Sequence, residues 1–182
     1  MFGAVNPGGK LTMTFPKSVG QIPLYYAHKN TGRPLKEGKW FEKFRSNYLD
    51  VDNDALYPFG YGLSYTTFRF SDITLNRSSI GMDNELVASV TVTNTGDRAG
   101  SEVVQLYIRD LVGSVTRPVK ELKGFEKIYL QPNESRTVRF TIAPEMLKFY
   151  NADLKFVAEP GDFDVMIGPD SRNVKTARFT LR

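Results

Sequence analysis

Three carboxylates with alternate spacing, Asp50, Asp52 and Asp54, could together bind a cation. This spacing matches positions 1, 3 and 5 of the calcium-binding EF-hand loop. That loop also requires a glycine at position 6 and a glutamate at position 12, where this sequence has Ala55 and Tyr61. The pattern therefore fails as an EF-hand. We expect a solvated acidic turn without a metal, and a weak surface cation site is the alternative.

A polar run around the single histidine is the second group that could do chemistry. It comprises His28, Lys29, Asn30 and Arg33. A catalytic triad needs a serine and a carboxylate beside the histidine, and no such arrangement is found near His28. We therefore expect no catalytic role for this run. Its side chains either reach another domain or hold a long irregular segment in place.

An aromatic cluster, formed by Trp40, Tyr57, Phe59, Tyr61 and Tyr65, follows the polar run in the sequence. The faces of such rings can stack against sugars, so the cluster could be a binding platform. A dense aromatic cluster is also typical of buried packing in which the hydroxyl groups find partners. Because the cluster adjoins an expected domain boundary, packing is the favoured interpretation.

The composition excludes several classes of protein. The 182 residues include no cysteine, which excludes disulfides, zinc–thiolate sites, iron–sulfur clusters and thiol nucleophiles. The net charge of +4 falls mostly in residues 1–60, whereas residues 61–182 are almost neutral with the signs interspersed. No basic face for nucleic acid is therefore predicted. No apolar run approaches the roughly 18–20 residues of a membrane span, so we expect no membrane partner. The first ten residues have neither a basic n-region nor an apolar h-region, so we expect no secretory signal in this chain.

From Thr66 onward, apolar and polar residues alternate with a period of two, which is typical of strands with one buried face. Turn signals such as the segment Asn94–Asp97 separate the strands. A phase change near Ser71 predicts a bulge in the first strand. Seven strands are expected around Thr67–Leu75, Leu86–Thr93, Val104–Arg109, Leu122–Leu130, Val138–Ile142, Phe163–Ile167 and Ala177–Leu181.

Seven such strands over about 115 residues fit a two-sheet β-sandwich of the immunoglobulin-like or fibronectin type III-like form. The absence of a cysteine pair favours the fibronectin-like form. We therefore predict a mainly β fold with an irregular N-terminal extension, and one helical turn at Pro144–Leu147. The core between the sheets is predicted to include Val90, Val92, Leu106, Ile108, Phe140, Val165, Ile167 and Phe179.

Residues 1–65 cannot build a core of their own. They contain one strand-like run, Leu11–Phe15, followed by a long stretch rich in Gly, Pro, Asn, Lys and Tyr. We expect this segment to lean on the sandwich or on a missing domain, and its lone strand to offer a free edge to a neighbour. We predict docking on the sandwich, or on a second copy of the chain, through Trp40, Phe41, Phe44, Tyr57, Phe59 and Tyr61.

Long, ordered sequence blocks then carry a resemblance to a known family. In the first 66 residues these blocks are Asn6–Leu11, Thr14–Pro16, Tyr25–Pro34 and Tyr57–Thr66. In the predicted sandwich they are Asn94–Gly96, Gly100–Tyr107, Arg117–Phe125 and Glu159–Gly161. They resemble the end of the α/β sandwich domain, the linker and the fibronectin type III-like domain of glycoside hydrolase family 3. The corresponding domains are predicted at residues 1–65 and 66–182.

This resemblance implies that the catalytic residues of the family lie outside this chain. Retaining glycosidases need a nucleophilic carboxylate and an acid/base carboxyl group about 5–5.5 Å apart. In the family, the nucleophilic aspartate belongs to an N-terminal barrel and the acid/base glutamate to an earlier part of the α/β sandwich domain. Both would lie upstream of this chain, so no catalytic residue, cofactor or metal ligand is expected here. The parent would be a periplasmic or secreted β-glucosidase.

Two functions remain open at this stage. In the first, the sandwich stabilises or positions upstream catalytic domains, or mediates self-association. In the second, it is a carbohydrate-binding module, which should expose a row of aromatic rings on one sheet face. The outward positions are mainly Thr, Arg, Ser, Gln and Asp, with Tyr107 as an exception, which favours the first function. Contacts with the upstream domain or an outer sugar subsite are expected from His28, Lys29, Asn30, Arg33, Trp40, Tyr57 and Tyr61.

Overall fold

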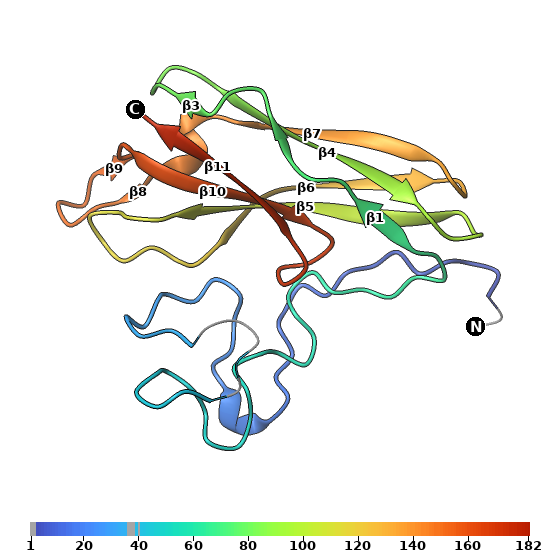
Figure 1. Ribbon diagram of the computed structural model, residues 1–182, viewed down its shortest axis with the longest axis horizontal. Helices are drawn as coiled ribbons and strands as arrows, with labels where there is room; N and C mark the ends of the chain where they lie inside the picture. Colours follow the sequence, from blue (N-terminus) through green and yellow to red (C-terminus); the bar gives the residue numbers. More distant parts are fainter. Residues whose placement is uncertain (1–2, 36–38, 40) are drawn as a thin grey trace.

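The computed structural model describes residues 3–35, 39 and 41–182 (Figure 1). Regular strands begin at Phe68, and the described residues before them are irregular apart from one short 3-10 helix, η1 (Val19–Gln21). Below, residues 3–65 are called the N-terminal segment. Trp40, one of the residues predicted to make contacts, lies outside the described residues.

The first sheet is built around a nine-residue strand in its centre. Its members are β1 (Phe68–Phe70), β2 (Thr74–Leu75), β4 (Leu86–Asn94) and β7 (Ser135–Ile142), and β4 pairs antiparallel with the other three. The predicted phase change near Ser71 separates β1 from β2. There the Ser71 backbone N–H donates to Thr91 O, and the Ser71 hydroxyl accepts the Thr91 N–H.

The second sheet has five strands in the order β3-β11-β10-β5-β6. The strands are β3 (Ser79–Ile80), β5 (Gly100–Asp110), β6 (Glu121–Leu130), β10 (Gly161–Gly168) and β11 (Lys175–Leu181). Only β3 and β11 pair in parallel among these described strands. The predicted helical turn is the 3-10 helix η2 (Pro144–Leu147), and a small separate hairpin joins β8 (Phe149–Tyr150) to β9 (Phe156–Val157).

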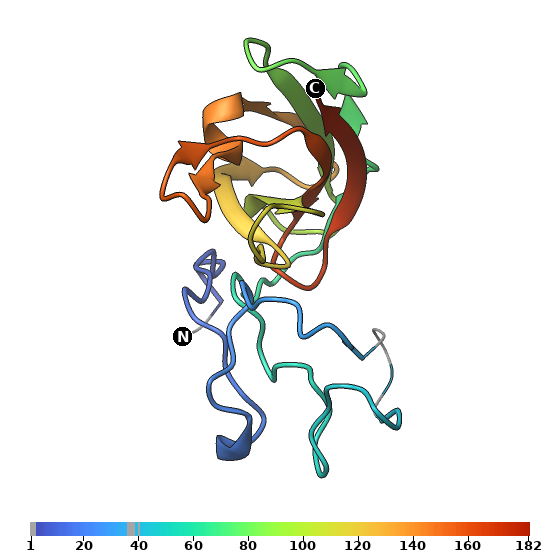
Figure 2. The same cartoon turned by 90° about the vertical axis from the view of Figure 1, so that its left-hand side faces the viewer.

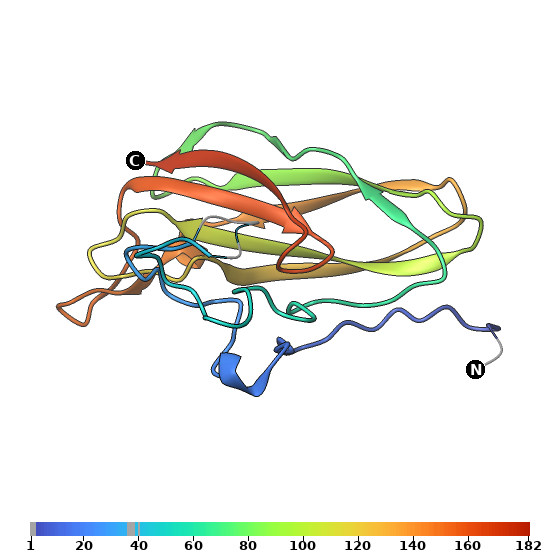
Figure 3. The same cartoon turned by 60° about the horizontal axis from the view of Figure 1, so that its bottom comes forward.

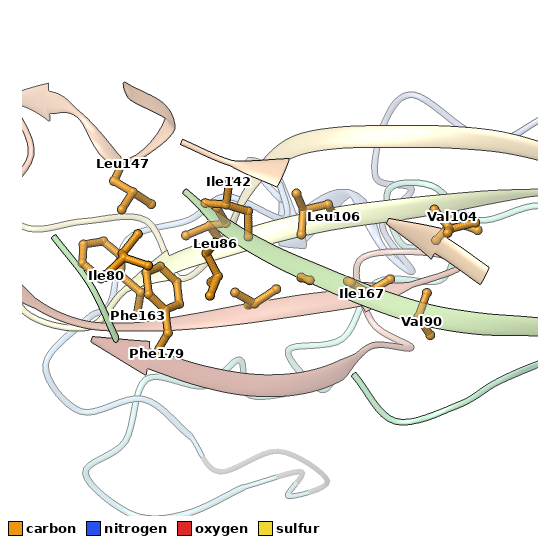
Figure 4. Close-up of a cluster of buried hydrophobic side chains, with 14 of the residues drawn as sticks. Ile80, Leu86, Val90, Val104, Leu106, Ile142, Leu147, Phe163, Ile167 and Phe179 are labelled. Carbon is orange, nitrogen blue, oxygen red and sulfur yellow. The ribbon is translucent and has the colours of Figure 1, made fainter. Parts of the chain in front are cut away.

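The two sheets pack face to face over one apolar core, which confirms the predicted fibronectin type III-like sandwich (Figure 4). Inward side chains from both sheets alternate with outward ones, as in β4, where every second residue is buried. Seven of the eight residues predicted for the core are buried. Phe140 is instead half-buried: β7 is an edge strand, and the ring lies beside Gly124 of the other sheet's edge strand.

The run Leu11–Phe15 is not a regular strand. The prediction that its edge is free is wrong for one of its two edges, because that edge is hydrogen-bonded within the chain. This run forms a ribbon with residues 57–61 of the same chain. Leu11 N–H donates to Tyr61 O at 2.8 Å, Gly60 N–H donates to Leu11 O at 2.8 Å, and Phe15 N–H donates to Tyr57 O at 2.9 Å. The linker before the sandwich therefore supplies the partner that sequence patterning could not identify.

Candidate functional site

The candidate site residues belong to the N-terminal segment, which runs beneath the five-stranded sheet (Figures 1 and 2). In both views this segment lies on one side of the sandwich, next to β5 and the β10–β11 turn. Its contacts with the sheet determine which of its side chains are buried and which remain exposed.

Gln105 and Tyr107 of β5 form the centre of these contacts. Tyr107 is completely buried and Gln105 is 3% exposed. The Tyr107 hydroxyl donates to Gln105 Oε1 at 2.6 Å, and Gln105 Nε2 donates to the carbonyl oxygens of Gly60 at 3.2 Å and Pro169 at 2.5 Å. Burial raises the pKa of the Tyr107 hydroxyl well above its usual value, so it stays a donor. The expectation that Tyr107 is an exposed outward residue is therefore wrong, because the N-terminal segment covers it.

Aromatic rings close the same contact. Tyr26 stacks on Phe59 with 4.4 Å between ring centroids, and its ring meets Tyr107 edge-on at 5.7 Å. The Phe59 carbonyl also accepts the Ser171 N–H at 2.9 Å. Phe59 thus docks on the sandwich as predicted, and Tyr26, which sequence reasoning missed, is the ring that joins it to the sheet.

Polar contacts extend this interface toward both ends of the segment. Lys10 Nζ lies 2.6 Å from Glu102 Oε1, and both side chains are mostly buried. The guanidinium of Arg172 donates to the Ala55 carbonyl, and Asn6 Nδ2 donates to Ala99 O at 3.2 Å. Because these partners are spread along β5 and the β10–β11 turn, the segment is fixed at several points rather than at one.

The predicted polar run is held by its backbone, while its side chains are exposed. Val119 N–H donates to His28 O at 2.9 Å, and Lys29 forms an isolated antiparallel bridge with Pro118. Further along, Ser46 N–H donates to Arg33 O at 2.9 Å. The side chains of His28, Lys29, Asn30 and Arg33 are all exposed. The run is therefore anchored to the β5–β6 loop and presents its polar groups outward.

Arg117 organises that β5–β6 loop. Its Nη2 lies 2.7 Å from Glu121 Oε2, and its guanidinium sits 4.3 Å from the ring centroid of Phe149. Asp110 carries a carboxylate 3.8 Å from Arg117 Nε, and burial raises the pKa of that carboxyl group. These contacts fix the loop whose next residues bind the polar run.

The other predicted aromatic contacts divide into two groups. Tyr57 stacks on Tyr61 at 4.9 Å, and Phe15 meets Tyr57 edge-on at 6.3 Å. These three rings form what is called the aromatic ribbon below, and Phe15 and Tyr57 are still 42% and 40% exposed. Phe41 and Phe44 are 54% and 72% exposed, so they do not dock on the sandwich, and the predicted alternative of docking on a second copy of the chain stays a prediction.

One carboxylate of the acidic turn, Asp52, forms an ion pair within the chain. Lys17 Nζ lies 2.7 Å from the Asp52 carboxylate, which also accepts the Asp54 N–H at 2.9 Å. The hydrogen bond from Lys17 lowers the pKa of Asp52. Among the described residues, no group of three or more His, Asp or Glu side chains is placed to hold a metal ion. No helix in the described part of the chain is long and apolar enough to cross a membrane.

Replacing Tyr107 with phenylalanine is expected to destabilise this contact by about 1–3 kcal/mol, because it leaves the buried Gln105 Oε1 without its donor. The ring and its contact with Tyr26 would be retained. Chemical denaturation of the wild type and of Tyr107→Phe measures the difference in the free energy of unfolding. The matched control is Tyr150→Phe, which changes an exposed tyrosine and should leave stability unchanged. Equal effects of the two substitutions would contradict the role given to the Tyr107 hydroxyl.

Comparison with known proteins relates this geometry to a family. Residues 1–65 match the glycosyl hydrolase family 3 C-terminal domain, and residues 102–171 match the fibronectin type III-like domain. The chain is 55% identical over 181 residues to the periplasmic β-glucosidase of Salmonella typhimurium. It corresponds to the C-terminal region of family 3 β-glucosidases. It is also 47% identical over 182 residues to a putative β-xylosidase of Formosa agariphila.

Solved structures of the family have the same fold in this region. The crystal structure of a β-glucosidase from Listeria innocua in complex with glucose matches 98% of this chain with a TM-score of 0.92 and 44% identity. The chain covers 25% of that structure, 24% of the Salmonella protein and 23% of the Formosa protein. This family 3 region therefore spans about a quarter of the relatives that it matches, and in them it is joined to further domains.

Proposed function

We propose that this chain is the non-catalytic C-terminal part of a longer family 3 β-glucosidase, in which the sandwich positions and stabilises the catalytic domains. The observation that carries the proposal is that the N-terminal segment combines docked and exposed residues. Part of it is fixed to the sandwich through Gln105, Tyr107 and Phe59. Elsewhere it carries large apolar side chains that the described part of the chain leaves exposed.

Many large hydrophobic side chains of the N-terminal segment are exposed. Large exposed hydrophobic side chains there include Val5, Met13, Phe15, Val19, Ile22, Tyr25, Leu49, Leu56, Tyr57 and Leu63. Scattered exposed apolar residues are ordinary, but a concentration of them marks a surface that contacts another protein surface. The upstream domains of the parent are the partner that fits, because relatives continue the same chain for about another three quarters of their length.

The domain division proposed is residues 1–65 as the end of the family's α/β domain with its linker, and residues 66–182 as the fibronectin type III-like domain. The parent would hydrolyse terminal β-D-glucosidic bonds with retention, using two carboxyl groups supplied by the upstream domains. Its compartment would be the periplasm or the cell exterior, as the name of the Salmonella relative supports.

The exposed polar run fits a position at this domain contact. His28, Lys29, Asn30 and Arg33 would donate hydrogen bonds to the upstream domain or to an outer sugar subsite. Tyr57 and Tyr61 would pack against the same domain through the aromatic ribbon, and Trp40 is a further candidate from the sequence alone. The β5–β6 loop would then have a positioning function, since it holds the backbone of the polar run.

A chimera tests this proposal. The chain would replace the corresponding quarter of the Salmonella β-glucosidase, and the chimera is expected to hydrolyse an aryl β-glucoside. Introducing Phe15→Ala and Tyr57→Ala together is expected to lower its thermal inactivation temperature by several degrees, because packing at the domain contact is lost. Tyr129→Ala, at an exposed ring on β6, is the control and should have little effect. Equal stability of all three chimeras would contradict the proposed contact.

The chain by itself is expected to show no glycosidase activity, because the two required carboxyl groups would lie upstream. Incubation of the purified chain with an aryl β-glucoside measures this directly. Turnover above a buffer blank that survives repurification, and is lost on mutation of a residue in this chain, would contradict the assignment.

A further inference from the structure

The small hairpin β8–β9 carries the feature that the proposed function leaves unexplained. Tyr150 and Phe156 form a cross-strand pair with 5.0 Å between ring centroids and 41° between ring planes. Their side chains are 66% and 52% exposed. Figures 1 and 3 show this hairpin at the end of the molecule, projecting beyond the two sheets. Two adjacent rings are thus presented to solvent outside the sandwich.

One face of the hairpin is anchored by buried contacts. Phe149, directly preceding Tyr150, is 4% exposed and lies under the Arg117 guanidinium, which also pairs with Glu121. The cross-strand partner of Phe149 is Val157, so the inner face of the hairpin is anchored while the outer face carries the rings. Exposed aromatic residues fixed in this way lose little conformational entropy when a ligand binds.

The hairpin turn is fixed as well. Asn151 Oδ1 accepts the N–H groups of Asp153 and Lys155, both at 3.0 Å. Asn151 N–H donates to Lys155 O at 3.1 Å, and Leu154 N–H donates to Asn151 O at 3.0 Å. These bonds fix the backbone of the turn, which carries the polar residues Asp153 and Lys155 between Tyr150 and Phe156 in the sequence.

The chemistry around the rings selects the class of ligand. Asp153 and Lys155 carry opposite charges, so the hairpin tip has no net charge and does not favour an ionic partner. Both side chains are exposed and can bond hydroxyl groups. Aromatic faces combined with neutral, hydrogen-bonding surroundings suit a sugar ring, which has an apolar face and a rim of hydroxyls.

We propose that Tyr150 and Phe156 form a stacking site for an uncharged, extended β-linked oligosaccharide. This inference rests on the proposed function, which supplies the β-linkage and the choice of glucose- and xylose-based sugars as probes. The site would hold polymeric substrate near the enzyme without taking part in hydrolysis. It differs from the carbohydrate-binding face considered from the sequence, because it lies on a hairpin rather than along a sheet.

Titration of the 182-residue chain with cellohexaose and xylohexaose, followed by NMR, tests the site. Amide shifts are expected to change in residues 149–157. The double variant Tyr150→Ala, Phe156→Ala should bind about tenfold more weakly or worse, which corresponds to about 1.4 kcal/mol. Tyr150→Phe keeps the ring and should stay within about twofold of the wild type. The double variant Phe125→Ala, Tyr129→Ala removes exposed rings from β6 and is the matched control.

Three results would overturn the proposal. The first is that no amide shift changes at millimolar concentrations of either sugar. The second is that the hairpin double variant binds sugar as tightly as the wild type, or that the β6 control variant loses affinity. The third is concentration-dependent self-association that the hairpin variant abolishes, since this would assign the rings to a second copy of the chain. Amide shifts of the Asn151–Lys155 turn in each variant show whether the hairpin is still folded. Where alanine unfolds it, Tyr150→Leu replaces the alanine variant, because leucine removes the ring but keeps an apolar side chain. The chimera experiment is independent, so either proposal can fail alone.

Discussion

Replacing Phe179 with alanine is expected to lower the free energy of unfolding by about 3–5 kcal/mol, the usual cost of removing a core aromatic ring. Phe179 of β11 is 1% exposed and stacks on its cross-strand partner Phe163 of β10, with ring centroids 5.4 Å apart. The substitution would leave a cavity between the sheets and remove the stacking contact. Denaturation with urea measures the change, and the slope with denaturant should stay constant if the native state remains compact.

Phe140→Ala is the matched control for this substitution. Its ring is only half-buried and lies at the edge of the sandwich beside Gly124, so solvent can fill part of the space that the ring leaves. The loss of stability should therefore be clearly smaller than for Phe179→Ala. Equal losses, or a loss below about 1 kcal/mol for Phe179→Ala, would mean that the burial of the two rings is assigned incorrectly.

The sandwich could be predicted because its signal is local. In β4 the alternation of apolar and polar residues continues for nine residues and coincides with the alternation of buried and half-buried positions. A run of that length fixes both the strand and the side that faces the core. The strands β3, β8 and β9 have two residues each, which is too short for a period of two to be recognised. The hairpin with Tyr150 and Phe156 was missed for this reason.

The interface could not be predicted in the same way, because its signal is not local. Gln105 and Tyr107 occupy outward positions of β5, and alternation alone assigns outward positions to solvent. They are buried because Tyr26 and Gly60, far away in the sequence, contact that face. A glutamine and a tyrosine two residues apart on one strand face offer a hydrogen-bonded pair, and this was the only local signal available. The sequence resemblance identified the segment but not its contacts.

The predicted contact residues show the same division. Phe59 docks because Tyr26 stacks on its ring and the Ser171 N–H donates to its backbone carbonyl. Phe44 has similar chemistry but stands in a tight turn at φ 66°, where Arg45 N–H donates to Glu42 O, and its ring is exposed. Hydrophobicity alone does not distinguish the two residues. The backbone conformation around each ring determines which of them reaches the sandwich.

Gly60→Ala is expected to release the N-terminal segment from the sandwich. Gly60 has φ +81°, a conformation that costs an alanine about 1–2 kcal/mol. An added Cβ would also strike the buried Gln105 amide, and displacing this group would break its bond to the Gly60 carbonyl at a further cost of about 1–3 kcal/mol. The opening of the segment should therefore become easier by about 2–5 kcal/mol, while the sandwich core is not touched.

Limited proteolysis in dilute solution measures this opening. Cleavage within the N-terminal segment should be about 30-fold faster or more in Gly60→Ala than in the wild type, since each 1.4 kcal/mol is a factor of ten in the open population. Gly32→Ala is the matched control: Gly32 also has φ +81°, but an added Cβ there meets nothing within 4 Å. It carries the same backbone strain without the collision with Gln105.

If the two variants are cleaved equally fast, Gln105 does not hold the segment. If residues 1–55 of the wild type are removed at once while the sandwich survives, the docking itself is wrong, because a segment that is held at Asn6, Lys10, His28, Ala55 and Gly60 must open before a protease can cut it.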